Sequence, residues 1–174
     1  MRAWVAHVFD HEVTDPSWWW QLPDDHEESP PAVAIAHLTR LFSAPSPALD
    51  RFTDEQVGQG LWFLFMGGCS DGAYVDRLGD WTLPLRERLA CLEAIPGSYR
   101  HFLAARCPDE RGSIAHRDSL GVTMYMLWDL GDLAPAGKEE ELDRALFRRM
   151  DAILAVPHAG CRESGARPAC LPCR

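Results

Sequence analysis

The sequence is poor in lysine and contains no run of basic residues. Lys138 is the single lysine, and 17 basic residues stand against 26 acidic ones, which gives a net charge of −9 and a pI near 5.2. Proteins that bind nucleic acid or anionic membranes present a basic face to them. The charge pattern therefore argues against nucleic acid and against an anionic membrane as the main partner.

Long apolar runs are also absent. No stretch approaches the roughly 20 apolar residues that a membrane-spanning helix needs. The first seven residues, Met1 to His7, have neither the apolar run nor the cleavage site of a signal peptide. We therefore expect a cytoplasmic protein whose six cysteines are thiols or metal ligands rather than disulfides. Cys69, Cys91 and Cys107 lie in or beside apolar segments and are expected to be small buried side chains.

The sequence has no alternation with a period of two, which would predict β-strands. Segments with helical spacing follow one another instead, and 174 residues suffice for one domain with a buried core. The pattern predicts an all-α protein of stacked antiparallel helical hairpins, either HEAT-like or an irregular bundle. It also predicts a single domain over 1–157 and an irregular tail over 158–174. The main predicted helices cover 30–44, 53–66, 84–95, 113–128 and 138–156, with a shorter helical face at Trp4, Val5, Val8 and Phe9.

The central helix has the clearest local signals. Thr53 and Gln56 have the spacing of a capping box, in which each side chain bonds the backbone amide of the other. The segment that follows is apolar on nearly every side, so other helices must surround it. Gly67 and Gly68 are expected to end this helix, because glycine adopts the left-handed C-cap conformation without strain.

Two proline-containing segments predict further helix boundaries. Ser29 is expected to cap the helix over 30–44, with Pro30 and Pro31 in its first turn. Pro96, Gly97 and Ser98 are expected to form a tight break, after which Tyr99, Phe102 and Leu103 begin a new helix. So short a connection predicts an αα-hairpin of two neighbouring helices.

The C-terminal tail contains the residues best suited to a metal. His158, Cys161, Cys170 and Cys173 could supply one imidazole and three thiolates to a tetrahedral zinc ion, and Cys170 and Cys173 have the spacing of a zinc knuckle. A second knuckle is missing, because Cys161 stands alone. A frayed tail is the favoured interpretation.

The N-terminal segment offers a second set of polar candidates. His7, Asp10, His11 and Glu12, with the acidic stretch 24–28 that contains His26, supply enough imidazole and carboxylate groups for a divalent metal. Their spacing matches no established ligand pattern, so a solvated acidic loop is favoured. Convergence of His7, Asp10, His11 and His26 on one pocket would favour an enzyme.

Two further motifs contain residues that often serve in binding or catalysis. Trp18, Trp19 and Trp20 could stack on a base, a sugar or a proline-rich peptide, although tryptophan also fills cores. Three consecutive tryptophans cannot all point the same way, so at least one should be exposed. Cys69 lies in a glycine-rich turn, but no histidine has a spacing that marks it as the base of a catalytic cysteine. The sequence assigns no catalytic, cofactor-binding or metal-binding residue, and it requires no cofactor.

Several segments resemble a family of uncharacterised bacterial proteins. They are 7–20 (His-Val-Phe-Asp-His-Glu-Val-Thr-Asp-Pro-Ser-Trp-Trp-Trp), 38–42 (Leu-Thr-Arg-Leu-Phe), 59–63 (Gln-Gly-Leu-Trp-Phe) and 68–71 (Gly-Cys-Ser-Asp). The resemblance extends to about Ser164 and implies an all-α fold with HEAT-like helical pairs, without catalytic residues to carry over. Members of the family continue past a match to 161–164 with another helix, so a frameshifted or truncated end is expected for the residues after Ser164.

The missing helix has a physical consequence for the helix over 138–156. Leu146, Met150 and Ile153 form an apolar stripe that a stacked array would cover with a neighbour, and the tail is not expected to supply one. We therefore expect a homo-oligomer contact or a partner site along this C-terminal helix.

The sequence favours a non-enzymatic, cytoplasmic helical protein that acts through protein–protein contact as a scaffold, an adaptor or an inhibitor-like partner. Its acidic charge and an exposed tryptophan suit a basic or arginine-rich protein partner. The alternative is a metal-binding protein or metal-dependent hydrolase that uses the N-terminal His/Asp/Glu set or the C-terminal cysteines Cys161, Cys170 and Cys173.

Overall fold

The protein is all-α. The structure, a computed structural model, describes residues 1–23, 29–65, 74–109, 119–130 and 139–166, and these contain helices and no strand. In chain order the elements are α1 (Arg2–Phe9), η1 (Trp18–Gln21), α2 (Pro31–Ser43), α3 (Ser46–Leu49), α4 (Asp54–Phe65), η2 (Tyr74–Gly79), α5 (Leu85–Ser98), η3 (Tyr99–Leu103), α6 (Ala104–Arg106), α7 (Ser119–Leu130), α8 (Glu140–Leu154) and α9 (Ala159–Ala166).

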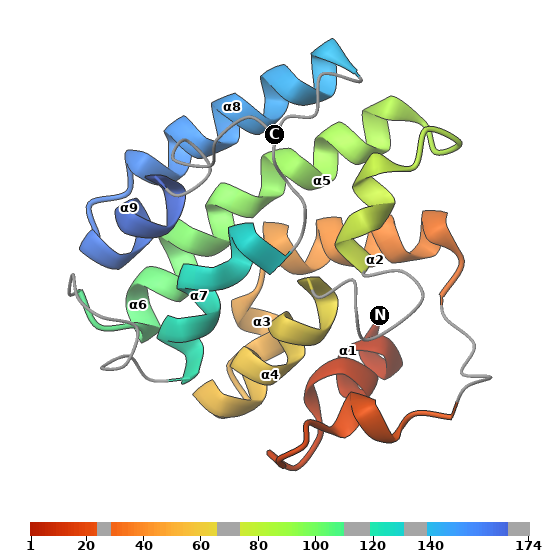
Figure 1. Cartoon of the computed structure of the whole chain (residues 1–174), viewed down its shortest axis with the longest axis vertical. Coiled ribbons are helices and arrows are strands. Elements are labelled where there is room, and N and C mark those ends of the chain that lie inside the picture. The colour runs from red at the N-terminus through yellow and green to blue at the C-terminus, as the bar shows by residue number, and fades with distance from the viewer. Residues whose placement is uncertain (24–28, 66–73, 110–118, 131–138, 167–174) are drawn as a thin grey trace.

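The helices form two rows that share one core (Figure 1). In the first row α5 lies between α2 and α8, and in the second row α4 lies between α1 and α7. The short helix α9 contacts both α7 and α8 at one end, while η2 contacts α2, α4 and α5. Each of these elements therefore covers an apolar face of another, which is how a helical domain excludes water from its core.

The predicted capping box is confirmed at the start of α4. The Thr53 N–H donates to Oε1 of Gln56, and the Gln56 N–H donates to Oγ1 of Thr53, each at 3.2 Å. From Val57 to Phe65 the helix then buries every residue except Trp62, as the apolar composition of this stretch predicts. Its expected end at Gly67 and Gly68 lies outside the described residues.

At the start of α2, Pro30 occupies the N-cap position and no side chain caps the helix, so the expected cap at Ser29 is wrong.

The hairpin expected at Pro96 to Ser98 is also wrong. Helix α5 continues through Pro96 to Ser98, and the chain then passes directly into the π-helical turn η3. Proline lacks the N–H that would bond the carbonyl four residues earlier, but it is tolerated here because packing holds the helix. Ile95 and Pro96 are buried, and the Ser98 hydroxyl donates to the carbonyl of Phe42 at the end of α2, at 3.0 Å.

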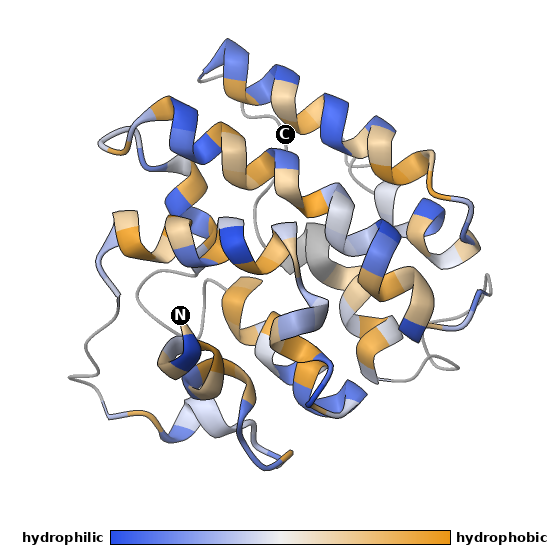
Figure 2. Cartoon of the chain, turned by 180° about the vertical axis from the view of Figure 1, so that it is seen from behind, coloured by the Kyte–Doolittle hydropathy of each residue, from blue (hydrophilic) through white to orange (hydrophobic). Residues whose placement is uncertain are grey.

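The predicted helix over 138–156 corresponds closely to α8, but the apolar stripe that the sequence predicts to be uncovered is buried in the structure. Leu146, Met150 and Ile153 are 5%, 6% and 0% exposed, because α5 and α9 cover the stripe. The tail was expected to be irregular, yet residues 159–166 form α9, which supplies the neighbour that α8 needs. Figure 2 shows hydrophilic and hydrophobic residues interleaved along α8, as on a helix with one buried face. Residues 167–174 lie outside the described part of the chain.

Among the described helices, none combines the length and the apolar character that crossing a bilayer requires. The regular stacking of a HEAT-like array stays a prediction, since helix order and contacts alone do not establish a repeat.

Candidate functional site

The C-terminal candidates His158 and Cys161 lie together, but in a structural role. His158 is the residue before α9, and its Nδ1 accepts the N–H of Cys161 at 3.2 Å, while its Nε2–H donates to the Cys107 carbonyl at 3.1 Å. The Asp109 carboxylate accepts the Ala159 N–H. These contacts satisfy amides of the first turn of α9 that have no partner within the helix. Nδ1 of His158 thus caps α9, and Nε2 ties the ring to the Cys107 carbonyl, so both nitrogens have hydrogen-bond partners.

The thiol of Cys161 is packed into the core beside His158. Its side chain is fully buried, and Sγ lies 3.9 Å from the Tyr99 carbonyl and 3.8 Å from Sδ of Met124. Burial, with a further contribution from the charge of Asp109, raises the pKa of this thiol to about 12. Cys170 and Cys173, the other expected ligands, lie outside the described residues.

A buried polar network ties α9 to the core beside Cys161. The Ser164 hydroxyl donates to the Met124 carbonyl at 2.6 Å, and its oxygen lies 3.2 Å from the Tyr99 hydroxyl. Burial raises the pKa of Tyr99 above its ordinary value. Because Tyr99 and Ser164 are both inaccessible to solvent, this network positions helices and presents no reactive group.

The N-terminal candidates meet only in part. The His11 ring stacks on Trp18, with centroids 3.8 Å apart and planes 8° from parallel, and the His7 ring lies edge-on to Trp18 at 5.6 Å. Asp10 and Glu12 are exposed instead, and His26 is outside the described residues. Within the described ranges, no three His, Cys, Asp or Glu side chains converge as a metal-binding group would. The two histidines therefore belong to an aromatic cluster, since His7 and Trp18 also contact the ring of Phe63.

The tryptophan run divides as its spacing predicts. Trp18 and Trp19 are 8% and 4% exposed, while Trp20 is 59% exposed. The indole N–H groups of Trp18 and Trp19 find no hydrogen-bond acceptor among the residues that the structure describes. Buried indole N–H groups usually find an acceptor.

An open groove of about 330 Å³ lies beside this segment, between it and helices α4 and α7. Its volume is at the lower end of the range for ligand pockets. Two side-chain amides of α4 hold the N-terminal segment in place: Gln56 donates to the His11 carbonyl at 2.9 Å, and Gln59 donates to the Glu12 carbonyl at 3.4 Å. The described residues that line the groove are Val13, Thr14, Ser17, Trp19, Glu55, Gly58, Gln59, Trp62, Ser119, Val122 and Thr123.

The floor of the groove depends on a close approach of α4 and α7 at Gly58. A Cβ atom at this position would lie 3.0 Å from Oγ of Ser119 and 3.2 Å from Oγ1 of Thr123. The Thr123 hydroxyl donates to the Ser119 carbonyl at 2.9 Å and lies 3.3 Å from the Gly58 carbonyl. A side chain at 58 would require Ser119 or Thr123 to shift by a few tenths of an ångström, so this glycine permits the close approach of the two helices beneath the groove.

The chemistry of the groove is anionic and partly aromatic. Glu55 is the one charged residue among its described lining residues, which include no lysine, arginine or histidine. Hydrogen bonds from its own N–H, and then from the Thr53 hydroxyl, lower the pKa of Glu55, so it is a carboxylate at neutral pH. The exposed carboxylates Glu12 and Asp15 lie on the segment that forms one wall. The groove therefore favours a cationic group over an anionic one.

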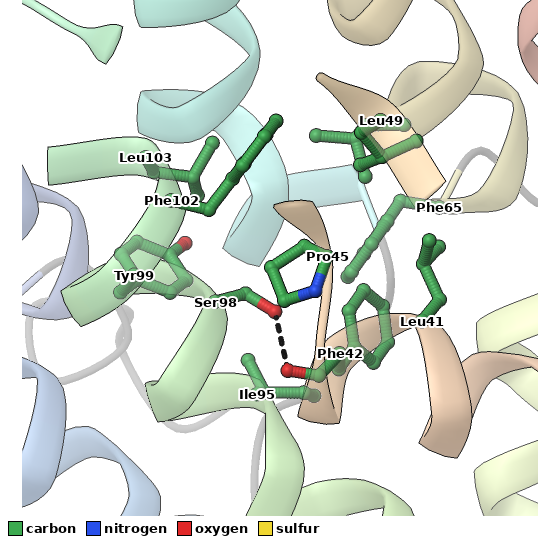
Figure 3. Close-up of a pocket in the computed structure, with 11 residues that line it drawn as sticks. Leu41, Phe42, Pro45, Leu49, Phe65, Ile95, Ser98, Tyr99, Phe102 and Leu103 are labelled. Carbon is green, nitrogen blue, oxygen red and sulfur yellow. Dashed lines mark hydrogen bonds between the residues drawn. The ribbon is translucent and has the colours of Figure 1, made fainter. Parts of the chain in front are cut away.

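A second, mostly enclosed cavity of about 20 Å³ lies between α2, α5 and α4 (Figure 3). The side chains around it are apolar apart from Ser98, whose hydroxyl is bonded to the Phe42 carbonyl, and Tyr99. A space of this size holds at most one water and needs polar partners to do so. It is a packing gap and not a binding site.

The sequence does not predict this groove. It only marks the run Trp18 to Trp20, beside the groove, as a candidate binding segment. Its walls come from residues 13–19, from α4 and from α7, and Thr14, Gln59 and Val122 carry no motif. One local signal exists, because Glu55, Gln59 and Trp62 are spaced to share one face of α4.

Comparisons of the chain with protein-family models, with curated proteins and with solved structures found no match. The resemblance to a bacterial family therefore stays a prediction.

Proposed function

We propose that this protein acts without catalysis, by binding a basic segment of a partner protein in the groove between residues 13–19, α4 and α7. The observation that carries the proposal is the composition of the groove, which has one carboxylate, two tryptophans and no cation among its described lining residues. The net charge of −9 has the sign that attracts a basic partner.

The surface beside the groove supports contact with a macromolecule. Val13, at its rim, is 50% exposed, and Trp20, on the same segment, is 59% exposed. Large aromatic residues are enriched at protein interfaces and often contribute most of the binding energy. The cytoplasm suits the described cysteines Cys91, Cys107 and Cys161, which are all free thiols.

A peptide titration tests the proposal. The probe is a fluorescein-labelled, twelve-residue peptide that alternates arginine and glycine, and its binding is followed by fluorescence anisotropy at physiological salt. We expect saturable binding by the wild-type protein and none of the corresponding glutamate peptide, because the groove offers an anion and no cation.

Two variants of equal charge separate binding in the groove from general attraction. Val13→Arg places a cation at the groove, and Ala90→Arg places one at an exposed position of α5. Val13→Arg should raise the Kd about tenfold or more, because it sets like charges against each other, while Ala90→Arg should change it less than about threefold. Equal effects of the two variants, or no binding by the wild type, would overturn the proposal.

A further inference from the structure

We infer that the groove selects arginine over lysine, with a guanidinium group of the partner paired to Glu55 and its methylene stem against Trp62. This inference rests on the proposed function and adds the side chain that the groove recognises. It follows from the arrangement of charged, polar and apolar groups along one face of α4.

Glu55, Gln59 and Trp62 follow one another at intervals of four and three residues. This spacing places them in one stripe on α4, about 10 Å long at 1.5 Å per residue, and all three line the groove. The stripe runs from an ionised carboxylate in the first helical turn, past an amide, to a half-buried indole. A long side chain with a charged head and an apolar stem is complementary to this order of groups.

The acceptors of the groove suit a guanidinium group better than an ammonium group. Glu55 provides two carboxylate oxygens to a planar fork of donors, a geometry that arginine matches with two parallel hydrogen bonds and lysine does not. Gln59 uses its amide nitrogen on the Glu12 carbonyl, which leaves Oε1 as the acceptor end of that side chain. Five N–H donors of one guanidinium group can therefore be distributed over these oxygens and water.

The apolar groups of the groove lie where the stem would run. Trp62 and Val122 are half-buried and Val13 is half-exposed, so each keeps surface that a methylene chain can cover. Arginine also stacks on aromatic faces more readily than lysine because its charge is delocalised and weakly hydrated.

The test compares two peptides of equal charge on the full-length protein. Twelve-residue glycine–serine peptides carrying three arginines or three lysines are titrated against the wild type, Glu55→Gln and Glu93→Gln. Glu93 is an exposed carboxylate on α5 and outside the groove, so its variant is matched in charge to Glu55→Gln. Thermal melts verify that both variants fold, and Glu55→Asp provides a second variant that keeps the charge but shortens its reach.

We expect the arginine peptide to bind the wild type about tenfold more tightly than the lysine peptide. Glu55→Gln should remove this preference, Glu55→Asp should reduce it, and Glu93→Gln should preserve it. Equal affinity of the two peptides for the wild type, with both weakened by Val13→Arg, would overturn the arginine inference and leave the proposed function standing. Failure of both peptides to bind would overturn the two together.

Discussion

The Arg88 guanidinium on α5 makes two hydrogen bonds with the Glu139 carboxylate, at 2.7 and 3.0 Å, at the start of α8. The Arg88 side chain is 3% exposed and the Glu139 side chain is 33% exposed, so solvent screens the pair on one side only. Arg88 also donates to the Leu78 carbonyl at 3.2 Å. One buried cation thus joins α5, η2 and α8.

Removal of the Glu139 carboxylate should destabilise the protein. Glu139→Ala leaves the buried guanidinium without its charged partner, and we expect the free energy of unfolding to fall by about 2 kcal/mol. Urea denaturation followed by circular dichroism measures the change.

The next residue provides the control for this variant. Glu140 pairs with Arg144 on the surface of the same helix, with both side chains mostly exposed, so Glu140→Ala should cost no more than about 0.5 kcal/mol. In the double variant Arg88→Met with Glu139→Ala, the buried charge is gone and part of the loss should be recovered. If Glu139→Ala is no worse than Glu140→Ala, the pair does not hold these helices together.

A second prediction concerns the contact between α1 and α4 at Gly60. A Cβ atom on Gly60 would lie 2.3 and 2.5 Å from ring atoms of Phe9 and 2.9 Å from the Val8 carbonyl oxygen. Alanine favours a helix over glycine by about 1 kcal/mol, but the backbone of α1 would have to move. We expect Gly60→Ala to lower the free energy of unfolding by about 1 to 3 kcal/mol, as overpacked cores do.

Gly79→Ala is the matched control, because a Cβ atom there meets nothing within 4 Å. It should change the free energy of unfolding by no more than about 0.5 kcal/mol, as ordinary surface substitutions do. Equal midpoints for the two variants would mean that α1 moves away from Gly60 without loss.

A third prediction concerns the buried thiols. Desolvation raises the pKa of Cys91 and of Cys161 to about 12, so only about one thiol in ten thousand is ionised at pH 8 in the folded protein. A brief pulse of iodoacetamide at pH 8, followed by peptide mass spectrometry, should leave both residues unmodified. The same pulse in guanidinium chloride should label both. Labelling of Cys161 in the folded protein would show that α9 opens, and that its thiol can serve as a ligand after all.

Local signals in the sequence predicted most helices, because caps and apolar periodicity act within a few residues. The capping box at Thr53 and the apolar stripe of α8 are examples, and the structure confirms both. Pro96 shows where such signals fail. Local propensity predicts a helix end, but the buried contacts of Ile95 and the bond from Ser98 to the Phe42 carbonyl keep the helix intact.

The candidate groove depends on contacts between residues that are far apart in the chain. The hydrogen bond from Gln56 to the His11 carbonyl spans 45 residues, and α7 adds a third wall. Composition favours a basic partner, and the run at Trp18 to Trp20 lies beside the candidate groove, which Trp19 lines. The sequence alone could not bring Glu55, Val13 and Val122 together, since none of the three belongs to a motif that specifies its neighbours.

A fourth prediction concerns stability at mildly acidic pH. The His37 ring on α2 stacks on Trp4, with centroids 4.9 Å apart, and its Nδ1 has no hydrogen-bond partner within the described part of the chain. Burial, followed by the positive charges of the N-terminus and Arg40, lowers the pKa of His37 below 6.5. As the pH falls through about 6.5, the unfolded chain therefore takes up a proton that the folded protein does not. This contribution to stability is complete above pH 6.5 and decreases below it.

His37→Gln removes the titrating group and keeps a polar side chain of similar length. Urea denaturation of both proteins at pH 7.5 and at pH 5.5 gives two differences in the free energy of unfolding. At pH 7.5 His37 is neutral in both the folded and the unfolded chain. The difference between the two proteins at that pH therefore measures the loss of stacking on Trp4 and no proton uptake. We expect the wild type to lose more stability than His37→Gln between pH 7.5 and pH 5.5. Only the wild type contains the His37 ring, whose affinity for a proton falls on folding. If the two proteins lose the same amount, His37 binds its proton equally well in the folded and unfolded states, and the stack with Trp4 does not disfavour the charged ring.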